Sequence, residues 1–363
     1  MLCHYSSASD TSLGTQVAIK KIHQPFTRSE LCQRAYLELK LLKLLKHENI
    51  AGLQDAFMSF GENLYLITQH QGMTLDQCFA SSILEPQFTK VFFYQLLRGL
   101  KYLHSANLVH CDLKPSSILI TRGCDLQITG LDHSRIHGER VTIDYAYDGR
   151  DQCYEAPELM LGAQTYQPAI DMWAAGCIFA EMINGAPLFS EERCTNQLYA
   201  IIKLLGYVPG DLMDGLSSGN IVGYLTSLPP RDWRPLRNHI SSSDIEALDL
   251  LEQLLDFDPV IRYPASQALE HAYLSLYHDP ADEPTSTMTW SVADLDYVEW
   301  PVNDWKTLMY VDSVPNHRPS SPTSTSTSVS ALPPSSYPRL PHPSSHPGQF
   351  ETTPLPLSTM ALF

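Results

Sequence analysis

The chain has 363 residues, 44% of them hydrophobic, which is enough for one large domain or two ordinary ones. The formal net charge of -16 argues against nucleic acid or an anionic membrane as the main partner, because both attract basic surfaces. The eight cysteines show neither metal-type nor paired spacing, which favours a reducing compartment, and no segment has the pattern of a membrane span or a secretory signal.

The first part of the chain predicts a small sheet with one helix. Residues 1–14 are polar and show no clear period, and Val17-Ala18-Ile19 then predicts a short buried strand. From Ser29 to Lys46, leucines recur along one stripe between charged side chains, which predicts an amphipathic helix. Two strands are expected next, at Leu53–Met58 and Leu64–Thr68, with Gly61-Glu62-Asn63 as the turn between them.

Beyond Gly72 the pattern becomes mainly helical. The segment Ile170–Ile183 is apolar on nearly all sides, which is typical of a helix buried all round. The other expected helices are Phe88–His104, Thr195–Leu205, Ile245–Leu255 and Ala265–His271. A small α+β part followed by a larger helical part predicts two lobes, with a cleft near residues 68–75.

The composition changes sharply at about Val314. Residues 314–363 are rich in Ser, Thr and Pro and carry almost no charge. Because such a segment cannot bury an apolar core, we expect it to be a disordered tail.

The segment His110-Cys111-Asp112-Leu113-Lys114-Pro115 has the chemistry of a phosphoryl-transfer loop. A carboxylate such as that of Asp112 can accept the proton of a hydroxyl group, and Lys114, two residues later, can face the transferred phosphate. A turn with purely structural hydrogen bonds is the alternative explanation of the same residues.

Six blocks in order resemble a eukaryotic protein kinase and, more narrowly, the stress-activated (osmotic-stress type) MAP kinases of fungi, in a divergent and N-terminally shortened form. They are VAIKK (17–21), AYLELKLLKLLKHENI (35–50), YQLLRGLKYLHSANLVHCDLKPSSILI (94–120), APELML (156–161), DMWAAGCIFAEM (171–182) and HAYLSLYHDPADEP (271–284). The resemblance implies an α+β, two-lobed protein-kinase-like fold. The implied parts are a truncated N-lobe (1–71), a mainly helical C-lobe (72–280), a MAP-kinase-type C-terminal extension (281–313) and the tail (314–363).

The resemblance also implies ATP with Mg²⁺ and assigns residues to them. Lys20 would hold the α- and β-phosphates, Glu38 on the following helix would be its ion-pair partner, and Thr68 would lie beside the adenine pocket. Asp112 would be the catalytic base, and Lys114 would neutralise charge on the γ-phosphate, as in Ser/Thr kinases.

Four further residues would be structural. Glu158 and Arg262 would form a buried ion pair in the larger lobe, and Asp171 would hold the backbone of the catalytic loop. His110 would pack in the core without acid–base work.

Asp279, Asp282 and Glu283 match the acidic patch with which MAP kinases capture basic linear motifs. The implied partners are an upstream MAP kinase kinase, protein substrates and phosphatases, and the implied location is the cytoplasm, with the nucleus as a second compartment. A solvated acidic loop without a partner is the alternative explanation of the charge pattern.

Five departures from the family pattern concern the catalytic machinery. The glycine-rich phosphate loop, the first strand and part of the second would precede Met1, unless the gene model is incomplete. The metal-binding Asp-Phe-Gly is Gly130-Leu131-Asp132, so Asp132 would reach a metal only with a rebuilt backbone. Ser117 replaces the second metal ligand, an Asn, and Ser is the poorer ligand.

The remaining two departures concern activation. Cys111 replaces the Arg that grips a phosphorylated activation loop, and no Thr-x-Tyr motif occurs between Asp132 and Ala156. Candidate modification sites in that segment are Thr142, Tyr145 and Tyr147.

Three interpretations remain open at this point. The chain is a MAP-kinase-type Ser/Thr kinase with impaired turnover, or a pseudokinase that docks pathway proteins as a scaffold or competitor, or a decaying gene product that folds poorly. Loss of metal ligation and of the phosphate loop would together cost about 10³-fold or more in rate. We therefore expect little Mg²⁺-dependent stabilisation by ATP.

Overall fold

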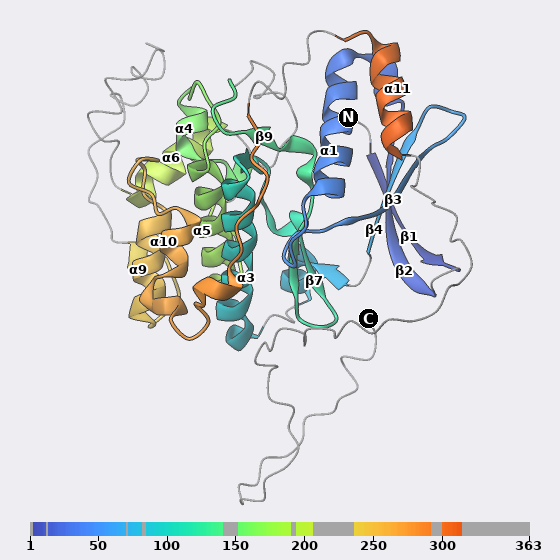
Figure 1. The fold of residues 1–363 in the computed structure, drawn as a ribbon. Coiled ribbons are helices and arrows are strands. Elements are labelled where there is room, and N and C mark those ends of the chain that lie inside the picture. Colours follow the sequence, from blue (N-terminus) through green and yellow to red (C-terminus); the bar gives the residue numbers. More distant parts are fainter. Residues whose placement is uncertain are drawn as a thin grey trace, which may run out of the picture. The chain divides into compact units, whose positions relative to one another are not determined.

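The computed structural model describes residues 3–11, 14–69, 72–81, 85–140, 152–189, 194–205, 236–291 and 300–313 (Figure 1). The chain divides into two units, Met1–Pro315 and Asn316–Phe363, and every described residue belongs to the first. Three predictions therefore fall outside the described residues: the tail at 314–363, the modification sites Thr142, Tyr145 and Tyr147, and the part of the expected cleft at residues 70–71.

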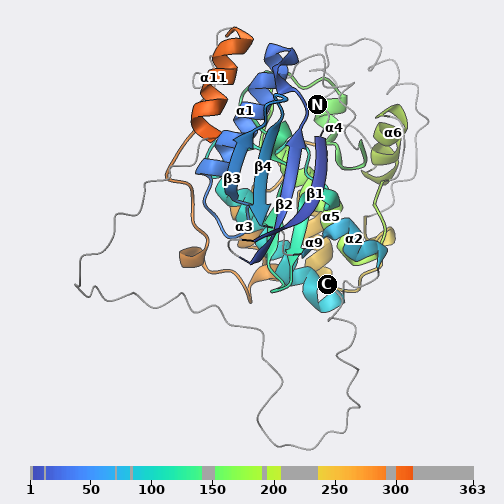
Figure 2. The same ribbon diagram turned by 90° about the vertical axis from the view of Figure 1, so that its right-hand side faces the viewer.

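Four antiparallel strands form the sheet of the N-lobe, in the order β1-β2-β4-β3 (Figure 2). They are β1 (Cys3–Asp10), β2 (Thr15–Ile22), β3 (Leu53–Met58) and β4 (Leu64–Gln69). Successive side chains of a strand point to opposite faces, so Lys20 and Ile22 of β2 are both buried while Lys21 between them is partly exposed. This alternation turns Lys20 into the lobe rather than toward solvent.

Strand β1 is an element that the sequence pattern did not predict. All eight of its residues pair with β2, from Cys3 opposite Ile22 to Asp10 opposite Thr15. Its side chains are mostly exposed and polar, so no period of two is visible in the sequence. Pairing with a neighbouring strand, rather than burial of an apolar face, defines this strand.

Helix α1 (Ser29–Leu44) packs against the N-lobe sheet, as its leucine stripe predicted. A second helix, α11 (Val302–Ser313), was not predicted and lies beside α1 in both ribbon views (Figures 1 and 2). Trp305 of α11 is 1% exposed, and its ring lies 5.6 Å from that of Tyr36, whose hydroxyl donates to Asp312 at 2.9 Å. The end of the described chain thus packs onto the N-lobe.

Helices α3 (Pro86–Ser105) and α5 (Ala169–Asn184) form the centre of the C-lobe. Every residue from Ile170 to Met182 is buried, which confirms the prediction of a helix buried all round. The rings of Phe93 and Phe179 stack at 4.1 Å and join the two helices. The remaining α-helices of the described residues are α2 (Leu75–Ala80), α4 (Pro157–Met160), α6 (Cys194–Leu205), α9 (Ile245–Leu254) and α10 (Ala265–Leu269).

Five short strands frame the loops of the candidate site. β5 (Gly72–Thr74), β7 (Ile118–Thr121) and β8 (Leu126–Ile128) form one sheet, and β6 (Leu108–Val109) pairs with β9 (Arg135–Ile136). Residues 110–117 therefore connect β6 to β7, and residues 129–134 connect β8 to β9. These loops include two 3-10 helices, Pro115–Ser117 and Leu131–His133.

The fold has an antiparallel sheet with the helices α1 and α11 packed in the N-lobe and a mainly helical C-lobe. Further 3-10 helices in the described residues are Pro25–Thr27, Gln152–Tyr154, Leu236–Asn238, Ala272–Leu274 and Pro280–Asp282. The α+β, two-lobed fold expected from the sequence is confirmed. No helix within the described ranges is both long enough and apolar enough to cross a membrane.

Candidate active site

Lys20 and Glu38 form a buried ion pair between β2 and α1. The Nζ atom of Lys20 donates to Oε1 of Glu38 at 2.7 Å, and the two side chains are 8% and 3% exposed. Strand alternation turns Lys20 inward, and Glu38 lies on the buried side of α1. The structure thus brings together the two residues that were expected to anchor the nucleotide phosphates.

A second carboxylate reaches the same lysine. Oδ2 of Asp132 lies 3.4 Å from the Lys20 ammonium, and Nε2 of His133 lies 3.7 Å from that Oδ2. Asp132 belongs to the 3-10 helix that begins after Gly130, whose φ of +76° lies in the left-handed region that favours glycine. Leu131, 1% exposed, anchors this turn in the core.

Burial and neighbouring charges shift the pKa values of Lys20, Glu38 and Asp132 in different directions. Burial alone would lower the pKa of Lys20, but the carboxylates of Glu38 and Asp132 outweigh it and raise that pKa. Burial raises the pKa of Glu38 to about 7 despite the adjacent lysine. Burial also acts to raise the pKa of Asp132, but Lys20 and His133 more than offset this, so its net pKa is lowered. At neutral pH, the carboxylate of Asp132 is therefore more fully ionised than that of Glu38.

Asp112 and Lys114 lie on the loop between β6 and β7. Nζ of Lys114 is 3.1 Å from Oδ2 of Asp112, and their side chains are 23% and 15% exposed. The backbone N–H of Asp112 donates to Nδ1 of His110 at 3.3 Å, and Nε2 of His110 donates to the carbonyl of Thr129 at 2.7 Å. Both ring nitrogens of His110 are thus engaged in holding the loop, in line with the packing role expected for it.

The buried carboxylate of Asp171 holds the backbone of this loop from α5. It accepts the N–H of His110 at 2.7 Å and that of Cys111 at 2.9 Å, and Nε2 of His104 lies 2.9 Å from it. Cys111 has a φ of +65°, a conformation that costs a non-glycine residue about 1 kcal/mol or more. The two hydrogen bonds that the Asp171 carboxylate accepts from the backbone offset that cost.

The hydroxyl of Ser117 is used within its own turn. Oγ donates to the carbonyl of Lys114 at 2.8 Å and accepts the N–H of Lys114 at 3.0 Å, and Ser117 is 6% exposed. A Cβ atom built on Gly130 would lie 3.5 Å from Cβ of Ser117, so the two positions face each other. Gly130 has no side-chain ligand, and the hydroxyl of Ser117 is engaged with the backbone of Lys114.

These side chains do not fit the Mg²⁺ site that the resemblance implied. Ser117 and Asp132 were the candidate metal ligands, but the first is bound to backbone and the second is paired with Lys20. The described part of the chain contains no group of three or more His, Cys, Asp or Glu able to hold a metal. A cation at this point would have to displace interactions that already exist.

The other predicted residues lie as follows. Thr68 is half-buried on β4 opposite Ala18 of β2, so it lies on the strand next to that of Lys20. Arg262 donates from Nη1 and Nη2 to the two carboxylate oxygens of Glu158 at 2.8 and 3.0 Å, with its side chain fully buried. The guanidinium also donates to the carbonyl of Asp256, which satisfies further N–H groups.

The docking prediction needs correction at Glu283. Its side chain is fully buried, with Oε2 at 3.0 Å from Lys101 and Oε1 at 2.9 Å from Nδ1 of His278. A carboxylate enclosed in this way cannot meet a peptide. Asp279 is exposed, and the side chain of Asp282 is 31% exposed, so these two keep the predicted property of accessible negative charge.

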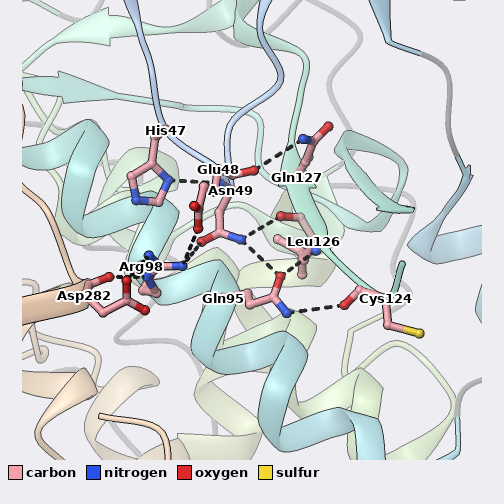
Figure 3. Close-up of polar contacts among 9 residues, drawn as sticks. All are labelled: His47, Glu48, Asn49, Gln95, Arg98, Cys124, Leu126, Gln127 and Asp282. Carbon is pink, nitrogen blue, oxygen red and sulfur yellow. Dashed lines mark hydrogen bonds and ion pairs between the residues drawn. The ribbon is translucent and has the colours of Figure 1, made fainter. Parts of the chain in front are cut away.

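Figure 3 shows a residue that the sequence analysis missed, Arg98 of α3. Its guanidinium donates to Oδ1 of Asn49 at 3.1 Å and to Oε2 of Glu48 at 3.4 Å, and its Nε donates to the carbonyl of Asp282 at 2.8 Å (Figure 3). Arg98 thereby ties the segment after α1 and the C-terminal extension to the C-lobe. An arginine within a strongly apolar helix was the signal in the sequence.

Known proteins resemble the chain along most of its length. The protein kinase domain family model matches residues 5–274. The mitogen-activated protein kinase HOG1 of Chaetomium globosum is 45% identical over 315 residues, which are 86% of this chain and 85% of that protein. The mitogen-activated protein kinase sakA of Aspergillus fumigatus is 46% identical over 315 residues, 86% of this chain and 84% of that protein.

The resemblance seen in the sequence blocks is thus confirmed by these matches. A third relative, the mitogen-activated protein kinase hog-1 of Neurospora crassa, is 44% identical over 86% of each chain. Protein kinases use ATP and Mg²⁺ in general, which makes the lysine pair and the altered metal positions the informative part of this site. The chain belongs to the protein kinase family and, within it, to the mitogen-activated protein kinases of the stress-responsive type.

Proposed function

We propose that the protein is a MAP-kinase-like serine/threonine kinase of an osmotic-stress pathway whose turnover is impaired. It would transfer the γ-phosphate of ATP to serine or threonine hydroxyls of proteins. The formed Lys20–Glu38 and Asp112–Lys114 pairs support the kinase assignment. The observation that carries the impairment is the hydroxyl of Ser117, which is bound to the backbone of Lys114 at a position expected to ligate metal.

Two residues would act on the hydroxyl that is phosphorylated. The carboxylate of Asp112 is partly exposed, so it can orient a serine or threonine hydroxyl and accept its proton. Lys114 lies 3.1 Å from that carboxylate and can turn its ammonium toward a phosphoryl oxygen. Both are fixed to a loop whose backbone Asp171 holds, so their positions are set before a substrate arrives.

The impairment follows from the relative weight of the contributions to this reaction. Phosphoryl transfer depends mainly on positioning and on electrostatic stabilisation, and the base contributes less. Stabilisation of the transferring phosphoryl group by a metal contributes several kcal/mol, and each ~1.4 kcal/mol corresponds to a tenfold change in rate. Retention of Asp112 alone therefore leaves the rate about 10³-fold or more below that of a fully equipped relative.

The proposed partners are an upstream MAP kinase kinase, protein substrates and phosphatases that carry basic docking motifs. The exposed carboxylate of Asp279 and the partly exposed carboxylate of Asp282, which lies 3.5 Å from Arg98, support this part of the proposal, whereas Glu283 does not contribute. The net charge of -16 favours basic peptide partners. The proposed location is the cytoplasm, with the nucleus as a second compartment.

A second candidate function is that of a pseudokinase that docks pathway proteins without transferring phosphate. The observation that favours it is the Asp132 carboxylate, which is directed at Lys20 rather than at a metal position. Architecture outside the metal positions, such as the Glu158–Arg262 pair, is intact and would preserve docking.

Phosphate transfer from labelled ATP to a general serine/threonine substrate separates the two functions. The comparison is between the purified chain and its Asp112→Asn variant, which keeps the shape of the side chain and one acceptor oxygen but cannot accept the proton. We expect slow transfer by the natural chain, at a rate clearly above that of Asp112→Asn. Equal rates for the two proteins would reject the kinase and leave the pseudokinase.

A further inference from the structure

The ammonium of Lys20 is already satisfied by the protein's own side chains. It lies 2.7 Å from Oε1 of Glu38 and 3.4 Å from Oδ2 of Asp132. The ring of Tyr5 on β1 lies across it, with 5.5 Å between Nζ and the ring centroid. A lysine that is expected to hold nucleotide phosphates thus has anionic and aromatic neighbours from the protein itself.

The two carboxylates differ in how firmly the fold holds them. Glu38 projects from the middle of a sixteen-residue helix, and its side chain is 3% exposed. Asp132 projects from a three-residue 3-10 helix, and its side chain is 20% exposed. A partly exposed side chain on a three-residue turn moves at lower cost than a buried one on a long helix, so Asp132 is the partner that an incoming anion can replace.

The backbone conformation of the turn that carries Asp132 directs its carboxylate toward Lys20. Gly130 adopts a left-handed conformation, and the N–H of Ser134 donates to the carbonyl of Leu131 at 3.1 Å, which closes the turn. With Leu131 buried and Gly130 lacking a side chain, the first carboxylate available to Lys20 on this loop is that of Asp132. The direction of Asp132 is therefore a property of the loop, and a metal is not needed to explain it.

We propose that Asp132 is an internal anionic ligand of Lys20, which occupies the place on the ammonium that a nucleotide phosphate takes and must be displaced when a nucleotide binds. This inference rests on the nucleotide site of the proposed function and adds a regulation of that site. Asp132 would then keep nucleotide affinity low. The role is opposite in sign to that of a metal ligand, because a metal ligand strengthens the binding of ATP with Mg²⁺.

The sign follows from electrostatics. A phosphate on Lys20 and the carboxylate of Asp132 are like charges that compete for one cation in a partly buried site, so they repel each other. The substitution Asp132→Asn keeps the size of the side chain and one acceptor oxygen but removes its charge. Binding of ATP without a divalent cation should therefore strengthen in this variant.

The experiment is a calorimetric titration of the full chain with ATP, once with excess EDTA and once with excess Mg²⁺. In EDTA we expect Asp132→Asn to bind ATP about tenfold more tightly than the natural chain. The matched control Asp125→Asn, which removes an exposed carboxylate from the turn between β7 and β8, should leave the affinity unchanged. Asp132→Gly is a second variant, with the same expected direction, in case the amide disturbs the turn.

A double-mutant cycle tests whether Asp132 acts through Lys20. In a Lys20→Met background the gain from Asp132→Asn should disappear, because there is no ammonium to compete for. A gain that persists in that background would overturn the proposal, since it would indicate general repulsion of the nucleotide.

The remaining outcomes separate this inference from the proposed function. Unchanged affinity of Asp132→Asn, with binding that still requires Lys20, overturns the inference and leaves the nucleotide site intact. Weaker binding of ATP with Mg²⁺ by Asp132→Asn overturns it in favour of Asp132 as a metal ligand. No binding of ATP by any of the proteins rejects the nucleotide site, and the inference with it.

Discussion

The carboxylates of Asp171 and Asp132 each hold a part of the candidate site in place, but with opposite consequences for its function. Asp171 is fully buried on α5 and holds the backbone of the loop that carries Asp112 and Lys114. Asp132 lies on a short 3-10 helix and holds the side chain of Lys20. The first fixes the reactive loop without occupying a functional group, whereas the second occupies the cation that a substrate would need.

The comparison shows that the two sides of the candidate site have diverged unequally from what the family pattern implies. On the side of the catalytic loop, the expected contacts of Asp171 and His110 are formed. On the side of the metal, Ser117 and Asp132 are engaged with protein groups and Gly130 contributes no ligand. A fold can thus keep its scaffold of buried hydrogen bonds while its metal positions take on other partners.

Loss of Asp171 should have the largest effect. Asp171→Ala leaves the N–H groups of His110 and Cys111 without an acceptor in a buried place, which costs about 1–3 kcal/mol for each group. We expect the free energy of unfolding in urea to fall by about 3 kcal/mol or more. The exposed Asp125→Ala should change it by less than about 0.5 kcal/mol. A loss below about 1 kcal/mol for Asp171→Ala would remove the claim that this carboxylate holds the loop.

Rebuilding the metal side should create a response to Mg²⁺. The triple variant Ser117→Asn, Gly130→Asp and Asp132→Gly restores the family residues, and aspartate tolerates the left-handed conformation of Gly130 better than most residues. At a ligand concentration of about 100 Kd, ATP with Mg²⁺ should stabilise it by about 2–3 kcal/mol in thermal unfolding. The control carries Gly130→Asn in place of Gly130→Asp and should lack the Mg²⁺ dependence. No difference between the two variants would contradict the account of the metal positions.

Titration of Glu38 should make the free energy of unfolding depend on pH. Its pKa of about 7 in the folded protein exceeds the ordinary value of 4.5, so the folded state binds more protons than the unfolded state between these pH values. Stability should therefore fall as pH rises from 5 to 8, by about 2–3 kcal/mol relative to Glu38→Gln. Urea unfolding of both proteins across this range measures the difference, and parallel curves would show that Glu38 does not titrate there.

The docking residues should show the smallest effect. Charge reversal by Asp279→Lys with Asp282→Lys should weaken binding of a basic docking peptide about tenfold at low salt, a difference that added salt reduces. Glu30→Lys with Asp55→Lys, exposed residues of the N-lobe, makes the same change in net charge and should have little effect. Fluorescence anisotropy of a labelled peptide provides the measurement. Equal affinities for both double variants would leave only non-specific attraction.

Much of the fold could be predicted from periodicity. The strand containing Lys20, the helix α1 and the buried helix α5 all have clear apolar patterns, and their positions agree with the structure. Strand β1 could not be found in this way, because its residues are polar and its pairing with β2 depends on the backbone. Helix α11 buries Trp305, Met309 and Ser313 at a spacing of four, a signal too short to stand out.

The candidate site was predictable only in part, because its key contacts join distant segments. The Lys20–Glu38 pair followed from the family resemblance. The contact of Asp132 with Lys20 depends on the φ angle of Gly130 and on where that turn lies in space, and no local pattern contains this. Glu283 was misjudged for the same reason, since its partner Lys101 is 182 residues away.

The central claim is that nucleotide binding depends on the lysine and gains little from a divalent cation. The most direct measurement is the ratio of the ATP dissociation constants of the natural chain in excess EDTA and in excess Mg²⁺. We predict a ratio close to one, because the hydroxyl of Ser117 is bound to the backbone of Lys114 and the carboxylate of Asp132 is paired with Lys20, so neither expected metal ligand faces the phosphates. Tightening by about tenfold or more with Mg²⁺ would contradict the account.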